Sequence, residues 1–256
     1  MGIWDIVVLS VVEGITEFLP VSSTGHLVLF SNLLNIPDSA FRTSFEIAIQ
    51  LGAILAVVLL YWRQLSAGPK VISRLAVSFL PVGILGFVFY RPIKEILLIN
   101  QTLIVWTIFL GGIFLIVFEY FYQEKETSID SIDDLTFSQA LKLGLFQAVA
   151  LIPGVSRSAA TIVGGLWLGL RRKTIVEFSF MMALPVMTVA TGYDLFKTAP
   201  TFTSQEITTL SIGFILSFLV ALVAMKVFLV VLSKQTFIIF GLYRIVFALI
   251  FLELVF

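Results

Sequence analysis

The sequence predicts an all-α polytopic membrane protein, and three observations lead to this prediction. Of its 256 residues, 59% are hydrophobic and only 12% are charged, whereas a soluble globular domain has about 25% charged residues. Several apolar stretches reach the length of about 20 residues that a membrane-spanning helix needs. The longest polar stretch, residues 123–136, is too short to form a soluble domain. We therefore expect residues 1–256 to form a single membrane domain.

Six stretches have the length and composition of transmembrane helices: residues 41–62, 71–91, 102–122, 174–196, 207–232 and 236–256. Two other apolar stretches, residues 3–34 and 137–170, are interrupted by the polar segments PVSSTG and PGVSRS. We expect each of them to form two half-length helices joined by a loop, which is a re-entrant helix-loop-helix hairpin. Irregular backbone at membrane depth is tolerated where it is buried in protein or lines a wet cavity.

The order of these elements occurs twice, which predicts an inverted-topology repeat. The first repeat covers about residues 1–122 and the second about residues 137–256, with the acidic linker 123–136 between them. Each repeat contains a hairpin followed by three spans. Because three is an odd number of crossings, the second repeat must be inverted relative to the first, a design that membrane proteins with broken helices use.

A local alignment supports this repeat. Placing VSST at residues 21–24 over VSRS at residues 155–158 also brings Glu13 onto Gln147. The similarity is weak residue by residue, so the matching order of elements is the stronger evidence.

The positive charges of the loops predict the orientation in the membrane. Nine Lys and Arg residues lie on one side and four on the other: Arg63, Lys70, Arg74, Lys125, Lys142, Arg171, Arg172, Lys173 and Lys234, against Arg42, Arg91, Lys94 and Lys197. We expect the first side to face the cytoplasm. Both termini and the base of the first hairpin then face outward.

The composition excludes several kinds of site. The chain has no cysteine, which excludes disulfides and thiolate metal sites, and its single histidine excludes a His-rich zinc site. A metal ion would have to be a hard divalent cation bound by carboxylates, such as Mg²⁺ or Ca²⁺. The formal net charge of zero gives no indication of nucleic-acid binding.

Two carboxylates in the first hairpin form the candidate metal site. Glu13 and Glu17 are four residues apart, so on a helix they share a face with Cβ atoms roughly 6 Å apart. Two carboxylates at this separation repel each other unless a cation lies between them or one is protonated. A divalent cation would also attract a phosphate. The alternative is an ordinary surface pair near the membrane interface.

The two polar loops each predict an anion site. In the first loop Pro20 ends a helix, and Ser22, Ser23 and Thr24 are favourable residues for beginning the next one. The free N–H groups at such a helix start bind anions.

The second loop repeats the arrangement and adds a cation. Ser156 and Ser158 follow Pro153-Gly154, and Arg157 stands between the two serines. A guanidinium group suits bidentate contact with a phosphate. The alternative is that the serines only cap helices and that Arg157 pairs with Glu13 or Glu17.

Two further ionisable residues stand in apolar segments. His26 lies three residues after Ser23, near enough on a first helical turn to exchange a proton with it, although a lone histidine can also be structural. Arg244 lies inside the last predicted span, and we expect it to pair with a carboxylate within the bundle.

At EGITEFLPVSSTGH, residues 13–26, and PGVSRSAAT, residues 153–161, the chain resembles the undecaprenyl-diphosphate phosphatase family, also called bacitracin-resistance proteins. The segments at 45–62 and 178–187 and the pair Tyr243-Arg244 add to the resemblance. It extends over essentially the whole chain.

This resemblance implies a divalent-cation-dependent enzyme of the bacterial inner membrane. It would hydrolyse undecaprenyl diphosphate to the monophosphate carrier of cell-wall synthesis, with an active site opening to the periplasmic or outer face. The implied partners are a polyprenyl diphosphate lipid and the bilayer. The sequence leaves the oligomeric state open and is compatible with a homo-oligomer.

Our hypothesis assigns a role to each candidate residue. Glu13 and Glu17 hold or recruit the metal ion, and Glu17 also assists proton transfer. Ser22, Thr24, Ser156 and Arg157 bind the diphosphate, and Ser23 attacks phosphorus with His26 as its base or as the residue that orients it. Direct attack by His26 is the competing assignment. The alternative from another class is a lipid-phosphate transporter or flippase, which would use the same anion site without a nucleophile.

Overall fold

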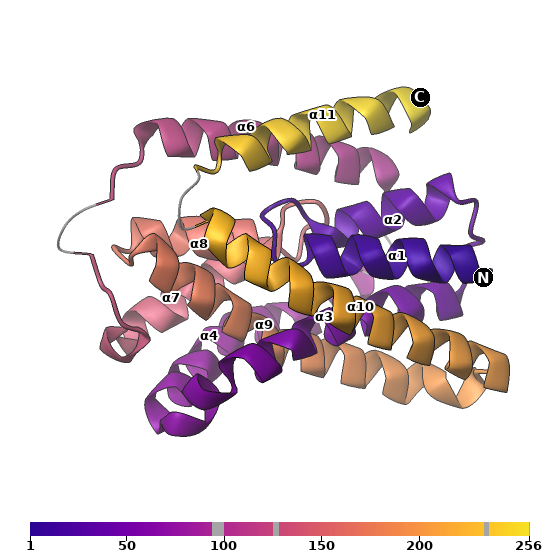
Figure 1. Cartoon of the computed structure of the whole chain (residues 1–256), viewed down its shortest axis with the longest axis horizontal. Helices are drawn as coiled ribbons and strands as arrows, with labels where there is room; N and C mark the ends of the chain where they lie inside the picture. The colour runs from indigo at the N-terminus through magenta and orange to yellow at the C-terminus, as the bar shows by residue number, and fades with distance from the viewer. Residues whose placement is uncertain (94–99, 125–127, 233–235, 256) are drawn as a thin grey trace.

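The computed structural model describes residues 1–93, 100–124, 128–232 and 236–255, which form a bundle of α-helices (Figure 1). The helices, in chain order, are α1 Ile3–Thr16, α2 Ser23–Leu33, α3 Ala40–Ala67, α4 Pro69–Val88, α5 Tyr90–Pro92, α6 Gln101–Phe121, α7 Phe137–Val149, α8 Arg157–Trp167, α9 Arg172–Thr198, α10 Ser204–Leu232 and α11 Ile238–Val255. Two short 3₁₀ turns, η2 Ile132–Asp134 and η3 Ala199–Thr201, lie in the connections. The prediction of an all-α protein is confirmed.

Five helices within the described residues are long and apolar enough to cross a membrane by length and composition: α3, α4, α6, α9 and α10. They correspond to five of the six predicted spans. The sixth predicted span, residues 236–256, corresponds to α11, which has 18 residues.

The two interrupted stretches form helical hairpins, α1–α2 and α7–α8, with the same local backbone. Ser22 and Ser156 precede α2 and α8 with φ values of 75° and 79°, in the left-handed region that residues other than glycine rarely adopt. Both second helices have 11 residues. They end in turns in which Asn35 and Gly169 have positive φ. All these positions match in the alignment of VSST with VSRS.

The packing of the helices pairs corresponding elements of the two halves. Helix α1 packs on α10 and α7 packs on α4, while α3 lies against α9 and α6 against α11. Figure 1 shows α6 and α11 side by side along one edge of the bundle. Small residues allow close approach, since a Cβ atom on Gly52 of α3 would lie 2.5 Å from the carbonyl oxygen of Phe214 in α10.

The loops of the two hairpins meet in the middle of the bundle (Figure 1). Ser158 of the second hairpin donates a hydrogen bond from its Oγ to the carbonyl oxygen of Leu19 in the first, at 2.7 Å. Thr107 of α6 donates from its Oγ1 to the carbonyl oxygen of Pro153 at 2.6 Å. The loops are therefore bonded to each other and to a long helix.

Arg244 of α11 joins both loops. Its side chain is fully buried, and its five N–H donors all bond to backbone carbonyl oxygens: Pro20 at 3.2 Å, Gly154 at 2.7 Å, Val155 at 3.0 Å, Thr107 at 3.1 Å and Ile108 at 3.1 Å. The expectation that Arg244 pairs with a carboxylate is wrong, because backbone carbonyl oxygens of the two loops and of α6 supply all its acceptors.

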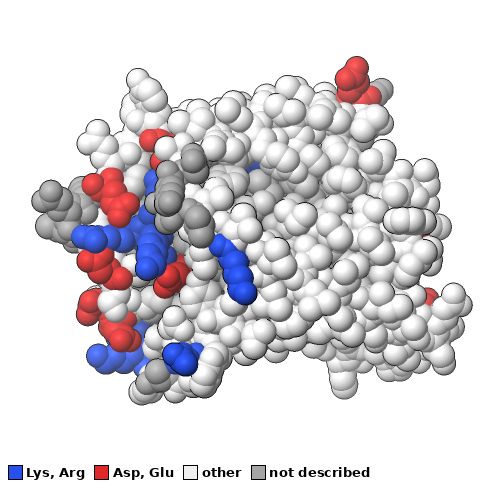
Figure 2. Space-filling model, viewed as in Figure 1, with Lys and Arg blue, Asp and Glu red and all other residues white. Residues whose placement is uncertain are grey.

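Charged side chains gather at one end of the bundle, where α6 leads into the linker (Figure 2). Both termini lie at the opposite end (Figure 1). Of the loop charges used to predict the orientation, Lys94, Lys125 and Lys234 lie outside the described residues.

Replacing Gly111 tests whether the path of Arg244 through the bundle is fixed. A Cβ atom on Gly111 would lie 2.1 Å from Nη2 of Arg244, so Gly111→Ala must displace the guanidinium and is expected to cost about 1–3 kcal/mol. The matched control is Gly192→Ala in α9, where nothing lies within 4 Å of the new Cβ atom. Thermal denaturation in detergent should show a lower melting temperature for Gly111→Ala alone. Equal melting temperatures for the two variants would contradict this assignment.

Candidate active site

A cavity of about 310 Å³ lies between the two hairpin loops, α3 and α9. It begins at the loops and extends to Asp38 and Arg42 at the start of α3. The Asp38 side chain is 84% exposed, so the cavity reaches the surface at the end of the bundle that carries both termini. Our hypothesis assigned roles to eight residues, and six of them line the cavity: Glu17, Ser22, Ser23, Thr24, Ser156 and Arg157. The other two, Glu13 and His26, are not part of its lining.

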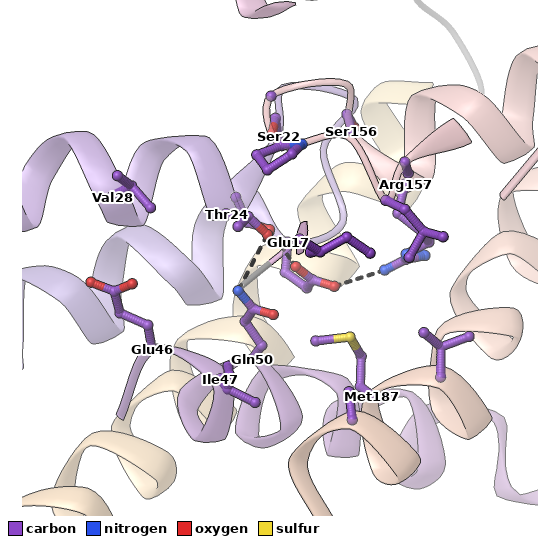
Figure 3. Close-up of a pocket in the computed structure, with 18 of the residues that line it drawn as sticks. Glu17, Ser22, Thr24, Val28, Glu46, Ile47, Gln50, Ser156, Arg157 and Met187 are labelled. Atoms are coloured by element: carbon purple, nitrogen blue, oxygen red, sulfur yellow. Dashed lines mark hydrogen bonds and ion pairs between the residues drawn. The ribbon is translucent and has the colours of Figure 1, made fainter. Parts of the chain in front are cut away.

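The carboxylate of Glu17 connects the two hairpins (Figure 3). Its Oε2 accepts a short hydrogen bond from the Ser23 hydroxyl. Its Oε1 accepts from Nη2 of Arg157 at 2.9 Å. Both side chains of this ion pair are largely buried, so the two hydrogen bonds lie in a region of low dielectric constant, where charge-assisted bonds are strong.

Arg157 is the first residue of α8 and points across the cavity. Besides Glu17, it donates from Nη1 to the carbonyl oxygen of Ser179 at 2.8 Å. The ion pair that the sequence left as an alternative is therefore present. It does not remove Arg157 from the candidate anion site, because the guanidinium also lines the cavity.

Hydroxyl groups surround the starts of α2 and α8. Ser156 caps α8, where its Oγ accepts from the Ala159 N–H at 3.2 Å. Thr24 accepts from Nε2 of Gln50 at 3.3 Å (Figure 3). Ser22 makes no capping bond from its side chain, so the first N–H groups of α2 remain available to an anion.

His26 does not form the predicted pair with Ser23. Its Nδ1 lies 2.8 Å from the carbonyl oxygen of Ser22 and its Nε2 lies 2.9 Å from the hydroxyl of Tyr243. Its ring stacks on Phe247 with 3.9 Å between centroids. The imidazole therefore faces α11, and Glu17 is the side chain that could accept a proton from Ser23.

Sequence reasoning missed three residues of the site. Gln50 and Gln147 line the cavity, and Tyr243 holds His26. A signal existed for Gln147, which aligns with Glu13, whereas Tyr243 was noticed only as part of the resemblance. Gln50 lies in an apolar span with no further pattern around it.

Comparison with known proteins identifies the family. The family model for bacitracin resistance protein BacA matches residues 6–250. The chain belongs to the BacA family. Among curated relatives, the undecaprenyl-diphosphatase of Wolinella succinogenes is 47% identical, with 98% of each chain covered. That of Aquifex aeolicus is 48% identical over 97% of this chain and 96% of its own.

Membership of the BacA family and the five long apolar helices together identify a multi-pass membrane protein. The family resemblance also implies a divalent cation, and the residues present can be tested for one. Glu13 is completely buried, and neither of its carboxylate oxygens accepts a hydrogen bond from a donor group among the residues that the structure describes. The Glu17 carboxyl group interacts with it, so the two can share a proton or a cation. A buried carboxylate without a hydrogen-bond donor is costly, and a hard cation would satisfy it.

The remaining ligands of such a cation would be neutral or come from the substrate. Within the described part of the chain, no cluster of three or more His, Asp or Glu side chains could hold a metal ion. Magnesium usually keeps several water ligands and binds one or two carboxylates together with substrate phosphates. Glu13 and Glu17 therefore fit a cation that binds together with a phosphate.

The environment of His26 predicts that it resists chemical modification. Since the side chain is buried and both ring nitrogens have partners, diethyl pyrocarbonate should leave His26 unmodified in the folded protein and modify it after denaturation. Peptide mass spectrometry can follow this single histidine without interference from others. Rapid modification of the folded protein would mean that the imidazole faces the cavity.

Proposed function

We propose that this protein is an undecaprenyl-diphosphate phosphatase, which converts undecaprenyl diphosphate to undecaprenyl phosphate and inorganic phosphate and so recycles the lipid carrier for peptidoglycan synthesis. The observation that carries the proposal is the Ser23 hydroxyl bonded to Glu17 beside Arg157 in one cavity. The names of the relatives support the same reaction. They favour a hydrolase over a transporter, and a nucleophile bonded to a base has no use in a carrier.

In the proposed reaction Ser23 attacks the terminal phosphorus. The Oγ–P bond forms while the bridging P–O bond breaks, and undecaprenyl phosphate leaves. Glu17 takes the hydroxyl proton, because it already accepts the Ser23 hydrogen bond. Water then attacks the phosphoserine, the Oγ–P bond breaks, and Glu17 returns the proton to Ser23 as inorganic phosphate is released.

Arg157 and the two helix starts bind the diphosphate in this proposal. Arg157 uses Nη2 for Glu17 and Nη1 for the carbonyl oxygen of Ser179, and a guanidinium has five N–H donors, so others can bind a phosphate oxygen while the ion pair with Glu17 is intact. The N–H groups at the start of α2, together with Ser22, Thr24 and Ser156, supply further donors. His26 acts as a positioning residue that fixes the Ser22 peptide next to the nucleophile.

A divalent cation, Mg²⁺ or Ca²⁺, completes the proposed site. Glu13 and Glu17 would hold it, and it would supply positive charge for the phosphoryl oxygens when bound. The oxygens of Glu13, which accept no hydrogen bond from a donor group among the described residues, support this part of the proposal.

We further propose that α1–α2 and α7–α8 are re-entrant hairpins within an inverted repeat that also has six spans. The matching φ values of Ser22 and Ser156 and the reciprocal packing of α1 on α10 and α7 on α4 support the repeat. The cavity opens at the end opposite most of the loop charges, which supports an outward-facing site in the bacterial inner membrane.

Phosphate release from undecaprenyl or farnesyl diphosphate by the purified protein tests the reaction. We expect Ser23→Ala and Glu17→Gln each to lose at least about a thousandfold in kcat, as nucleophile and base variants do. We expect His26→Ala to retain more activity, because it removes only a positioning contact. An active Ser23→Ala together with an inactive His26→Ala would assign the attack to His26. A folded wild type without phosphate release would refute the phosphatase.

Thermal denaturation tests the cation without relying on turnover. Adding Ca²⁺ or Mg²⁺ to the EDTA-treated wild type should raise its melting temperature, since binding at a hundredfold excess over Kd stabilises by about 2.7 kcal/mol. Glu13→Gln should abolish this rise, whereas Glu253→Gln, at an exposed carboxylate of α11, should retain it. An equal rise in wild type and Glu13→Gln would exclude Glu13 as a ligand.

A further inference from the structure

Gln147 of α7 is a buried polar side chain whose amide makes no hydrogen bond to the described residues. It is 1% exposed, and neither Oε1 nor Nε2 has a hydrogen-bond partner among the described residues. It nevertheless lines the cavity that also contains Ser23, Glu17 and Arg157. An amide that is buried without partners costs free energy, and most native proteins avoid it. Its position beside a candidate active site points to a ligand that the amide binds.

A second glutamine on α7 shows that the lack of hydrogen-bond partners is specific to residue 147. Gln139, on the same helix, has partners for its amide: its Oε1 accepts from the Thr136 N–H at 3.0 Å and its Nε2 donates to the carbonyl oxygen of Leu168 at 3.3 Å. Gln139 therefore has a structural role at the start of α7. Gln147, near the other end of α7, has none.

The matching position in the first hairpin narrows the chemistry of the ligand. Glu13 aligns with Gln147, and its carboxylate also accepts no hydrogen bond from a donor group among the described residues. A carboxylate can only accept hydrogen bonds or bind a cation, whereas an amide both donates and accepts and carries no charge. The second hairpin also contributes Arg157 to the cavity, so its side of the cavity provides donors for anionic oxygen atoms.

We propose that Gln147 is a substrate-binding residue that contacts the diphosphate group. Its Nε2 donates a hydrogen bond to a non-bridging phosphate oxygen, and its Oε1 accepts one from a water molecule on the same phosphate. This inference rests on the proposed phosphatase function and adds a residue to it. A neutral donor suits this position because a second cationic side chain here would compete with Arg157 for the Glu17 carboxylate, whereas an amide binds the phosphate without doing so.

Two variants at the position and one control test the proposal. Gln147→Leu keeps the size of the side chain and removes its hydrogen bonds, and we expect kcat/KM for farnesyl diphosphate to fall roughly a hundredfold, as when one oxyanion donor is removed. Gln147→Glu keeps the shape and repels the diphosphate, so its loss should be larger. Gln139→Leu should lower the melting temperature and leave kcat/KM within about twofold of wild type, as expected away from the site.

Binding of a non-hydrolysable analogue separates this proposal from the reaction itself. Titration with farnesyl methylenediphosphonate should show weaker binding for Gln147→Leu than for wild type, whether or not the wild type releases phosphate. If Gln147→Leu has the same kcat/KM and the same affinity for the analogue as wild type, the proposal is overturned, even if the melting temperature changes. Gln147 would then have only a structural role, with its amide bonded to a buried water molecule. If Gln147→Leu does not fold, the same two measurements on Gln147→Glu decide, and wild-type values there would overturn it.

Discussion

The arrangement of the site depends on the five hydrogen bonds of Arg244. Two loops that meet inside a membrane protein gain little from apolar burial, because lipid is as apolar as their neighbours, so packing and hydrogen bonds must hold them. Arg244 binds the carbonyl oxygens of Pro20 in one loop and of Gly154 and Val155 in the other. C=O and N–H point in opposite directions across a trans peptide. Because these carbonyl oxygens point toward Arg244, the N–H groups of the same peptide units point away from α11. The buried charge is solvated by the irregular backbone that it holds in place.

The two hairpins divide the chemistry between them. The first contributes the Glu17 carboxylate and the Ser23 hydroxyl to the cavity, with the buried Glu13 one helical turn before Glu17. The second contributes Arg157 and Gln147 to the same cavity. The two halves, which have similar loops, therefore present acceptors on one side and donors on the other, as the proposed binding of a cation and a diphosphate requires.

The sequence predicted most of the helices and both hairpin loops, but it did not predict the hydrogen-bond partners of the buried polar side chains. The interrupting segments PVSSTG and PGVSRS predicted both hairpin loops, since proline and serine have strong local preferences at helix ends. The partner of His26 could not be predicted in this way, because Tyr243 lies 217 residues away and spacing along one helix says nothing about such contacts. The expectation for Arg244 failed because its acceptors are backbone carbonyl oxygens of the two loops and of α6. Every residue has such a carbonyl, so the sequence cannot indicate which ones a buried arginine will bind.

The backbone at Ser22 and Ser156 places two side chains, one from each hairpin, on the Glu17 carboxylate. Ser22 and Ser156 both adopt positive φ values, with ψ values of 83° and 114°, at a cost of about 1–3 kcal/mol each. Each turn makes the next residue the first of its helix. That residue is Ser23 in one half and Arg157 in the other, and these two are matched in the alignment. They bond to the two oxygens of the same Glu17 carboxylate. The two similar turns therefore bring the proposed nucleophile, Ser23, and the proposed phosphate-binding guanidinium, Arg157, to one carboxylate.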